Sequence, residues 1–500
     1  MSESGNTPSE RYLAKLCRRS FLSLWSFANP YTDEGRRSGK GAGQELCDLL
    51  VVFGNNVITF SDKFVRYDLS QPIEVAWSRW YRHAIAKSAQ QLAGAEHWLR
   101  RYPGRVYVDR HCSTPLPVVI PRDSDIRIHR VAVAGGAYQP CQDFFGGNSL
   151  GSLMINSDIQ GDQHKGSPFC VGNVAPEKGF VHVFDEFSLA AVFNEIDTIS
   201  DFTSYLSRRE RFLTAGKPSV LACGEEQLLA FYLKTVNDVG EHDFLIPTGK
   251  HAECGNVFFD ETHWDHLRSH PQYRAKKEAD GVSYIWDNLI EHFVSRGGFV
   301  DYPESATVDA QKDLERCVRE MASEDRFRRR QLGEAFENLL ATVGVGESRV
   351  RVVYATATCD NLYVFLVVSP QAGESYDDYR RRRISGLHGY CNVAKLQSPH
   401  SRYVIGIALE PKGSDGGSED LIVIDTSRWT PEMESAAREL QLREGLLLDT
   451  NVTRRKTSIN EYPELPRTEV DPVSAARRRS DDRKTKRNLQ KRSRKRNRNK

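Results

Sequence analysis

The sequence predicts a multidomain α/β protein that ends in a disordered basic tail. Three observations support this prediction. The chain has 500 residues, which is too long for a single hydrophobic core. Strand-like apolar runs alternate with amphipathic helical patterns in the N-terminal part, and the same alternation returns after about residue 346. The last residues are polar and strongly basic, as is typical of a disordered tail.

Changes in composition and pattern divide the chain into five segments, with the first domain boundary near the Gly216-Lys217-Pro218 turn. We expect disorder over 1–9, an α/β domain over 10–216, a mainly helical domain over 217–345, a small α/β domain over 346–446 and a disordered basic tail over 447–500.

Hydrophobic periodicity predicts the elements of the first domain. The expected order is a helix over 10–27, a hairpin over 45–63, a long helix over 73–101, strands within 105–109, 116–120 and 126–135, and a strand followed by a helix over 180–213. The 346–446 segment predicts strand, strand, helix, strand, strand and helix.

Composition argues against membrane and secreted classes. The longest apolar runs, such as Leu49 to Phe53 and Tyr363 to Val368, are far too short to span a bilayer. The N-terminus is polar, unlike a secretory signal. Ten cysteines are scattered without a CxxC pair, which favours reduced thiols over a disulfide framework or a structural zinc site. We therefore expect a cytoplasmic protein.

Charge is distributed unevenly along the chain. From Arg477 to Lys500 there are fourteen Lys or Arg against two Asp, a net of +12, so the rest of the chain carries 2 − 12 = −10. A basic tail on an acidic body favours a nucleic-acid partner, for which we expect DNA rather than RNA. The expected phosphate contacts are Arg36, Arg37 and Lys40 in a Gly-rich loop and Arg492, Arg494, Lys495 and Arg496 in the tail. The alternative is a solvated tail without a partner.

The hairpin carries the candidate chemistry. An Asn55-Asn56 turn would pair Asp48 with Lys63 and place Ser61 on the same face, at the sheet end away from the turn. A slip of one residue would instead bring Asp62 opposite Asp48. An exposed ion pair is the simpler alternative, but both strands are apolar enough to be covered on both faces.

An amphipathic helix, this hairpin and a long following helix resemble the core of the restriction-endonuclease-like, or PD-(D/E)xK, nucleases, over about residues 10–135. The resemblance implies that Asp48 is the first metal-binding acid and that Lys63 activates water and stabilises phosphate charge. It also implies Mg²⁺ as the cofactor. The (D/E) position is Ser61, so Glu45 or Asp62 would supply the missing metal ligand, and Ser61 would either support the ligands from behind or be a weak ligand itself.

Two functions follow from this resemblance. The first is a Mg²⁺-dependent nuclease, of bacterial origin, in defence against foreign DNA or in DNA repair. The alternative is a catalytically inactive protein that binds nucleic acid or a ribonucleoprotein through a degenerate nuclease fold and the basic tail. In either case the middle and C-terminal domains would select a target, bind a partner protein or form a homo-oligomer.

Other groups of residues are weaker candidates. The histidines and cysteine at 251, 254, 263 and 266 have loose metal-ligand spacing, but a His-rich core or surface segment explains them as well. Asp197 and Asp201, four apart in a predicted helix, are more typical of helix capping. The run Arg380 to Arg383 could grip phosphate or simply be solvated. The sequence contains no dinucleotide-binding fingerprint in a strand–helix context.

Overall fold

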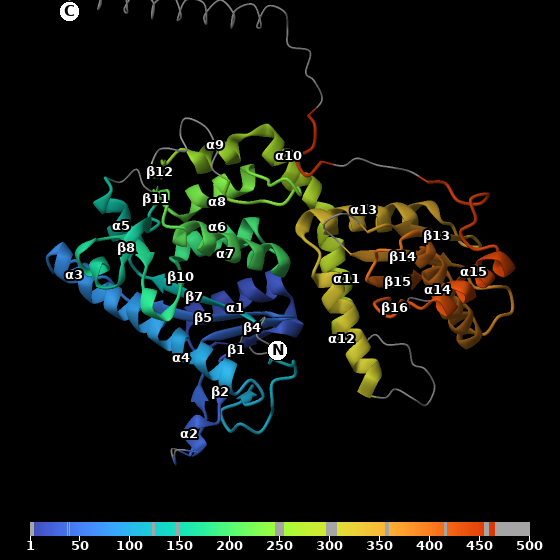
Figure 1. Ribbon diagram of the computed structural model, residues 1–500, viewed down its shortest axis with the longest axis horizontal. Helices are drawn as coiled ribbons and strands as arrows, with labels where there is room; N and C mark the ends of the chain where they lie inside the picture. Colours follow the sequence, from blue (N-terminus) through green and yellow to red (C-terminus); the bar gives the residue numbers. More distant parts are fainter. Residues whose placement is uncertain are drawn as a thin grey trace, which may run out of the picture.

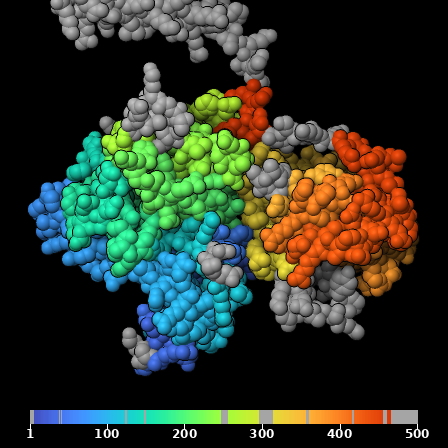
Figure 2. All heavy atoms as spheres, in the orientation of Figure 1, coloured from blue at the N-terminus to red at the C-terminus, as the bar shows by residue number. Residues whose placement is uncertain are grey.

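A computed structural model describes residues 5–37, 39, 41–122, 126–146, 150–245, 255–296, 308–355, 360–414, 418–454 and 460–465. The described chain is mixed α/β, as predicted. Two lobes are visible, with helices α11, α12 and α13 between them (Figure 1). In the space-filling view the orange C-terminal lobe stands beside the blue-to-green N-terminal lobe (Figure 2).

A five-stranded sheet forms the centre of the N-terminal lobe. Its strand order is β1 (Ser26–Ala28), β4 (Leu49–Phe53), β5 (Asn56–Phe64), β7 (Arg127–Gly135) and β10 (His182–Phe184). The first three strands are antiparallel, whereas β5, β7 and β10 run parallel. The sheet is therefore mixed, and its parallel half requires helical crossovers.

Helices cover both faces of this sheet. On one face, α1 (Pro8–Phe21) packs against alternate strand residues such as Val51 and Phe60. On the other face, α4 (Lys87–Arg101) packs against Leu50 and Val57. The α4 helix continues α3 (Ile73–Tyr81) through one π-helical turn, so the predicted long helix is confirmed. In chain order the core is helix, strand, strand, strand, helix, strand.

The start of α1 corrects one prediction. Thr7 caps the helix by accepting a hydrogen bond from the Glu10 amide, and Pro8 occupies the first turn. The predicted disorder of 1–9 is therefore wrong for the residues that enter the helix.

The hairpin turn differs from the predicted one. Phe53 pairs with Asn56 and Leu49 with Phe60, so the turn residues are Gly54 and Asn55. Glycine adopts the required positive φ, here 55°, without a steric cost. The register is shifted by two residues from the prediction, and Asp48 lies opposite Ser61 rather than Lys63. An even shift preserves the strand faces.

A small three-stranded sheet is inserted before the hairpin. Its strand order is β3 (Gln44–Glu45), β2 (Tyr31–Thr32) and β6 (Val106–Tyr107), with the short helix α2 (Glu34–Arg37) between β2 and β3. The predicted strand at 116–120 does not form; an isolated bridge joins Tyr107 to Pro115 instead.

A second mixed sheet crosses the predicted domain boundary. Its order is β12 (Asn256–Phe259), β11 (Ser219–Ala222), β8 (Met154–Gln160) and β9 (Cys170–Asn173). Leu221 pairs with Asn156, so the boundary placed near 216 falls inside one sheet. The Pro-containing turn there connects a helix to a strand rather than two domains. This part of the chain also forms the helices α5 (Tyr138–Phe144), α6 (Glu186–Glu195), α7 (Ile199–Thr214) and α8 (Glu225–Lys234). Helix α8 contacts β11, whereas α6 and α7 contact β7 of the central sheet.

The remaining elements follow the prediction closely. After β12 the chain forms α9 (His263–Ser269), α10 (Pro271–Ala279), α11 (Tyr284–Arg296), α12 (Val308–Ala322) and α13 (Arg326–Thr342). The C-terminal lobe then runs β13 (Ser348–Val353), β14 (Asn361–Val368), α14 (Tyr376–Gln397), β15 (Tyr403–Leu409), β16 (Asp420–Asp425) and α15 (Pro431–Glu444). This is the predicted order, in a sheet ordered β13-β14-β15-β16.

Part of the predicted disordered tail is held against the fold. Glu461 lies 3.3 Å from the Lys276 amine, and the Tyr462 hydroxyl donates to the Leu233 carbonyl. The polar composition of this segment suggested disorder, but Glu461 also pairs with His242 at 3.0 Å, and Arg330 donates to the carbonyls of Asn460 and Glu461. Buried ion pairs, hydrogen bonds and one aromatic ring therefore hold the segment against the fold. The basic residues from 477 onward lie outside the described part of the chain.

Gly136 provides a test of how the end of β7 is built. Its φ is +94°, and an added Cβ would lie 2.2 Å from the Val65 carbonyl oxygen. Gly136→Ala should therefore destabilise the fold by about 2 kcal/mol or more in urea unfolding. Gly94→Ala is the matched control, because Gly94 lies in α4 with nothing within 4 Å of an added Cβ. It should stabilise by about 0.5–1 kcal/mol. Equal effects of the two substitutions would contradict this account.

Candidate active site

Four carboxylates gather where the hairpin meets α1. Glu10 comes from the first turn of α1, Glu45 from β3, Asp48 from the residue before β4 and Asp62 from β5. These four residues are the acidic cluster. Asp48 and Asp62 are buried, at 6% and 8% exposure, whereas Glu10 and Glu45 are half-buried.

The side chain of Asp48 extends the strand pairing by one residue. Its amide donates to the Phe60 carbonyl at 3.0 Å, as a normal strand residue would. One carboxylate oxygen then accepts the Asp62 amide at 2.5 Å. A carboxylate that takes the place of a backbone carbonyl is held rigidly. Asp48 is therefore fixed beside the segment Asp62-Lys63.

Asn29 connects the other two acids. Its side-chain amide nitrogen lies 3.2 Å from a carboxylate oxygen of Glu10 and 3.2 Å from one of Glu45. The backbone N–H of Asn29 donates to the Asp48 carbonyl at 3.0 Å. Asn29 has a positive φ of 47°, which asparagine tolerates better than most residues. One side chain thus brings the acid from α1 to the acids of the strand segment.

The crowded acids perturb one another. Burial raises the pKa of Asp48, and the positive charge of Lys63 opposes this effect. Burial raises the pKa of Glu45 as well, with a hydrogen bond from Asn29 opposing and the charge of Asp48 adding to it. Burial also raises the pKa of Asp62 to about 6, although a hydrogen bond from Ser9 favours its ionised form. Such shifts mark a site where a bound cation would relieve unfavourable negative charge.

Lys63 and Ser61 differ from each other in what they contact. Within the described residues Lys63 makes no ion pair shorter than 4.0 Å, although its charge acts on Asp48 and Asp62. Ser61 is fully buried, and its hydroxyl lies 3.2 Å from Ser88 Oγ and 3.2 Å from Gln91 Oε1 of α4. The Ser61 hydroxyl is therefore engaged with the helix, which favours a supporting position behind the metal ligands over direct metal ligation.

The acidic cluster does not form a closed metal cage. A metal cage needs at least three His, Cys, Asp or Glu side chains with their ligand atoms close together. Among the described residues, such a group with ligand atoms within 4.8 Å of one another is found elsewhere, at His129, His182 and Glu210. Mg²⁺, however, is usually bound by one or two carboxylates together with waters and substrate phosphates. Asp48 and Glu45 are close enough to share a hydrogen bond, so they could hold such an ion.

No family model, no curated protein and no solved structure matches this chain. Its function has to be argued from the site itself. None of the described helices combines the length and the apolar character that a bilayer span requires.

The predicted phosphate-binding residues are only partly described. Arg36 donates to the His111 carbonyl, and Arg37 pairs with Asp33 at 3.2 Å. Lys40 and the tail residues Arg492, Arg494, Lys495 and Arg496 lie outside the described residues, as do His251 and Cys254.

The arginine run in α14 contributes to the fold. Arg383 is fully buried and donates to Asp420 at 2.5 Å, so it is not available to a ligand. Arg380 contacts the same carboxylate at 3.2 Å.

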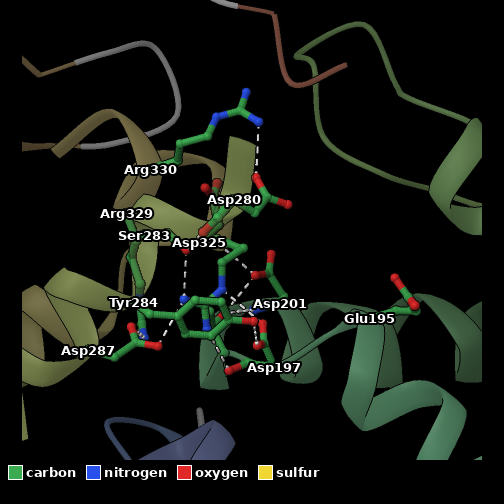
Figure 3. Close-up of polar contacts among 12 residues, drawn as sticks. Glu195, Asp197, Asp201, Asp280, Ser283, Tyr284, Asp287, Asp325, Arg329 and Arg330 are labelled. Carbon is green, nitrogen blue, oxygen red and sulfur yellow. Dashed lines mark hydrogen bonds and ion pairs between the residues drawn. The ribbon is translucent and has the colours of Figure 1, made fainter. Parts of the chain in front are cut away.

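A buried arginine–aspartate network near the start of α13 is a second candidate site. Arg326 donates to Asp197 at 2.8 Å and to Asp287 at 2.9 Å, and Arg329 donates to Asp287 at 2.6 Å. Figure 3 shows Asp197 at the start of α7 and Asp287 on α11. Asp197 precedes α7, which Thr198 caps, so the predicted placement of Asp197 within the helix is wrong. Since the charges neutralise one another, the network joins helices and offers little to a substrate.

Asp325, at the start of α13, makes the stability of the fold depend on pH. Burial raises its pKa to about 7, and the neighbouring Asp201 adds to the shift. Because this folded-state pKa exceeds the unfolded value of about 3.9, the native state binds more protons between about pH 4 and 7. The contribution of Asp325 to stability therefore falls as the pH rises through this window.

In Asp325→Asn the free energy of unfolding should decline less steeply between pH 5 and 8 than in the wild type. The difference in slope should correspond to at most one bound proton, because asparagine can still cap α13 but does not titrate. Urea unfolding at several pH values measures this. Asp377→Asn, at an exposed position in α14, is the control and should leave the slope unchanged. An unchanged slope in Asp325→Asn would contradict the assignment.

Sequence reasoning missed Glu10 and Asn29. Both lie outside the hairpin that carries the motif, and neither has a distinctive spacing from Asp48. Glu10 is three residues after the capping residue Thr7, where an acid is ordinarily explained by helix capping. Only the packing of α1 against the hairpin reveals its second role.

Proposed function

We propose that this protein is a Mg²⁺-dependent nuclease with a restriction-endonuclease-like core in its N-terminal lobe. The observation that carries the proposal is the hydrogen bond from the Asp62 amide to the Asp48 carboxylate. It fixes an acid on one strand beside a lysine on the next, although fifteen positions separate Asp48 from Lys63 in the chain.

The surrounding architecture supports the proposal. The resemblance rests on an amphipathic helix, a hairpin and a long following helix, and the chain has α1, the β4–β5 hairpin and the α3–α4 helix in this order. The acidic cluster lies at the end of the hairpin away from its turn. Asp48 and Glu45 would bind the metal with substrate phosphate oxygens, and Glu10 and Asp62 would add negative charge. Lys63 would stabilise the charge that develops on the phosphate.

Cleavage assays with the purified full-length chain test the proposal. Supercoiled plasmid, linear duplex, single-stranded DNA and RNA are incubated with Mg²⁺, with Mn²⁺ and with EDTA. We expect phosphodiester cleavage that requires Mg²⁺ or Mn²⁺ and stops in EDTA. Absence of cleavage on every substrate with both metals would reject the nuclease.

The alternative is a binding protein without catalytic activity. The contacts of Ser61 favour this alternative. Ser61 occupies the position of the second acid of the motif, and its hydroxyl is hydrogen-bonded to α4 instead of facing a metal. This alternative predicts salt-dependent DNA binding without cleavage, and deletion of residues 477–500 should reduce the salt slope.

A further inference from the structure

A buried group of two histidines and one glutamate lies at the other end of the central sheet. His129 is on β7, His182 on β10 and Glu210 on α7. In the parallel register His182 pairs with Val131, two residues along from His129, so both imidazoles point to the same face. One ligand atom from each of the three residues lies within 4.8 Å of the other two.

One ring nitrogen of each histidine lacks a partner. His129 is 4% exposed and His182 is 1% exposed, and the Nε2 atom of each is buried without a hydrogen bond. Burying an unpaired polar atom is costly, so native proteins usually satisfy it or use it. Among the described residues Glu210 has no ion-pair partner within 4.0 Å. Its charge interacts with those of Arg130 and Arg209, so the three side chains gather two unpaired imidazole nitrogens and one carboxylate in one place.

We propose that His129, His182 and Glu210 bind a first-row divalent metal ion, with Zn²⁺ as the best match. Two imidazole nitrogens and one carboxylate oxygen are a donor set that zinc accepts, and three protein ligands leave one position for water or another donor.

The neighbouring arginines are compatible with a cation because carboxylates already neutralise them. Arg130 Nε lies 3.3 Å from Glu96 Oε2. Arg209 forms two hydrogen bonds of 2.7 Å with Glu225, through Nε and Nη2. Its third nitrogen, Nη1, lies 3.3 Å from Nδ1 of His182. For metal binding at Nε2, the ring proton moves to Nδ1 and Arg209 gives up this one contact while keeping its pair with Glu225.

This site is separate from the acidic cluster. Lys63 lies beside Ala134 of β7, five residues from His129, which is roughly 16 Å along a strand. The donor sets differ as well, since carboxylates suit Mg²⁺ and imidazoles suit zinc. The zinc proposal therefore does not depend on the proposed nuclease activity.

The test measures metal binding directly. The full-length protein is stripped with a chelator and titrated with Zn²⁺ against a chromophoric competitor, and Co²⁺ serves as a spectroscopic probe. His129→Gln and Glu210→Gln are compared with Asp377→Asn, which removes an acid at an exposed position of α14 in the C-terminal lobe. Thermal unfolding with and without Zn²⁺ accompanies each titration, because binding to the native state raises the melting temperature.

We expect one Zn²⁺ per wild-type chain and a loss of affinity of at least about 100-fold in both ligand variants, since even outer-shell changes cost 10- to 100-fold. The control variant should bind like the wild type. If His129→Gln does not fold, Glu210→Gln decides the question, because Glu210 is half-buried at the end of the site. Absence of Zn²⁺ binding, or equal affinity in Glu210→Gln and the wild type, would overturn the proposal.

Discussion

Lys63→Ala should reduce the rate of Mg²⁺-dependent cleavage by at least ~100-fold, and Asp48→Asn should do so by at least as much. Lys63 would supply a positive charge to the phosphate in the transition state, and removing one such group typically costs 10²–10³-fold. Asp48 would supply a metal ligand that no nearby side chain replaces in the same backbone-anchored position. Initial cleavage rates at saturating Mg²⁺ measure both effects.

The matched controls are Lys165→Ala and Asp162→Asn. These residues form an exposed ion pair of 2.6 Å far from the hairpin in sequence, so each substitution should leave the rate within about twofold of the wild type. Circular dichroism checks that all four variants are folded. Cleavage that survives in both Lys63→Ala and Asp48→Asn would show that the nuclease site lies elsewhere.

Asp287→Ala should destabilise the fold by about 3–5 kcal/mol, because it removes the partner of two buried cations. Asp287 accepts hydrogen bonds from Arg326 and Arg329, which are 6% and 1% exposed. Arg326 keeps its contact with Asp197, but Arg329 is left in the interior without a carboxylate, which is costly although the intact network itself adds little net stability. Urea unfolding at pH 7 measures the change.

Glu434→Ala is the control for this prediction. Glu434 pairs with Arg438 at 2.6 Å, but both side chains are exposed. Solvent screens such pairs, so the loss should be below about 0.5 kcal/mol. A similar loss in Asp287→Ala and Glu434→Ala would mean that the buried network does not contribute as a unit.

The fold was most predictable where local pattern and burial agree. The strand–strand–helix–strand–strand–helix order of the C-terminal lobe follows from apolar runs bounded by turns, and it is confirmed. Local pattern could not show that residue 216 lies inside one sheet, because strand β11 pairs with β8, which lies more than sixty positions earlier in the chain. Local periodicity carries no information about such long-range pairing.

The candidate site shows the same division. The sequence by itself determined that Asp48 and Lys63 lie at the open end of an apolar hairpin, because strand alternation and a turn residue depend on neighbours in the chain. The tertiary structure alone decided which groups join them. Packing of α1 brings Glu10, packing of α4 takes Ser61 away, and the parallel pairing of β7 with β10 creates the His129–His182–Glu210 group. The physical reason is that side-chain burial and partner choice depend on surfaces that meet only after folding.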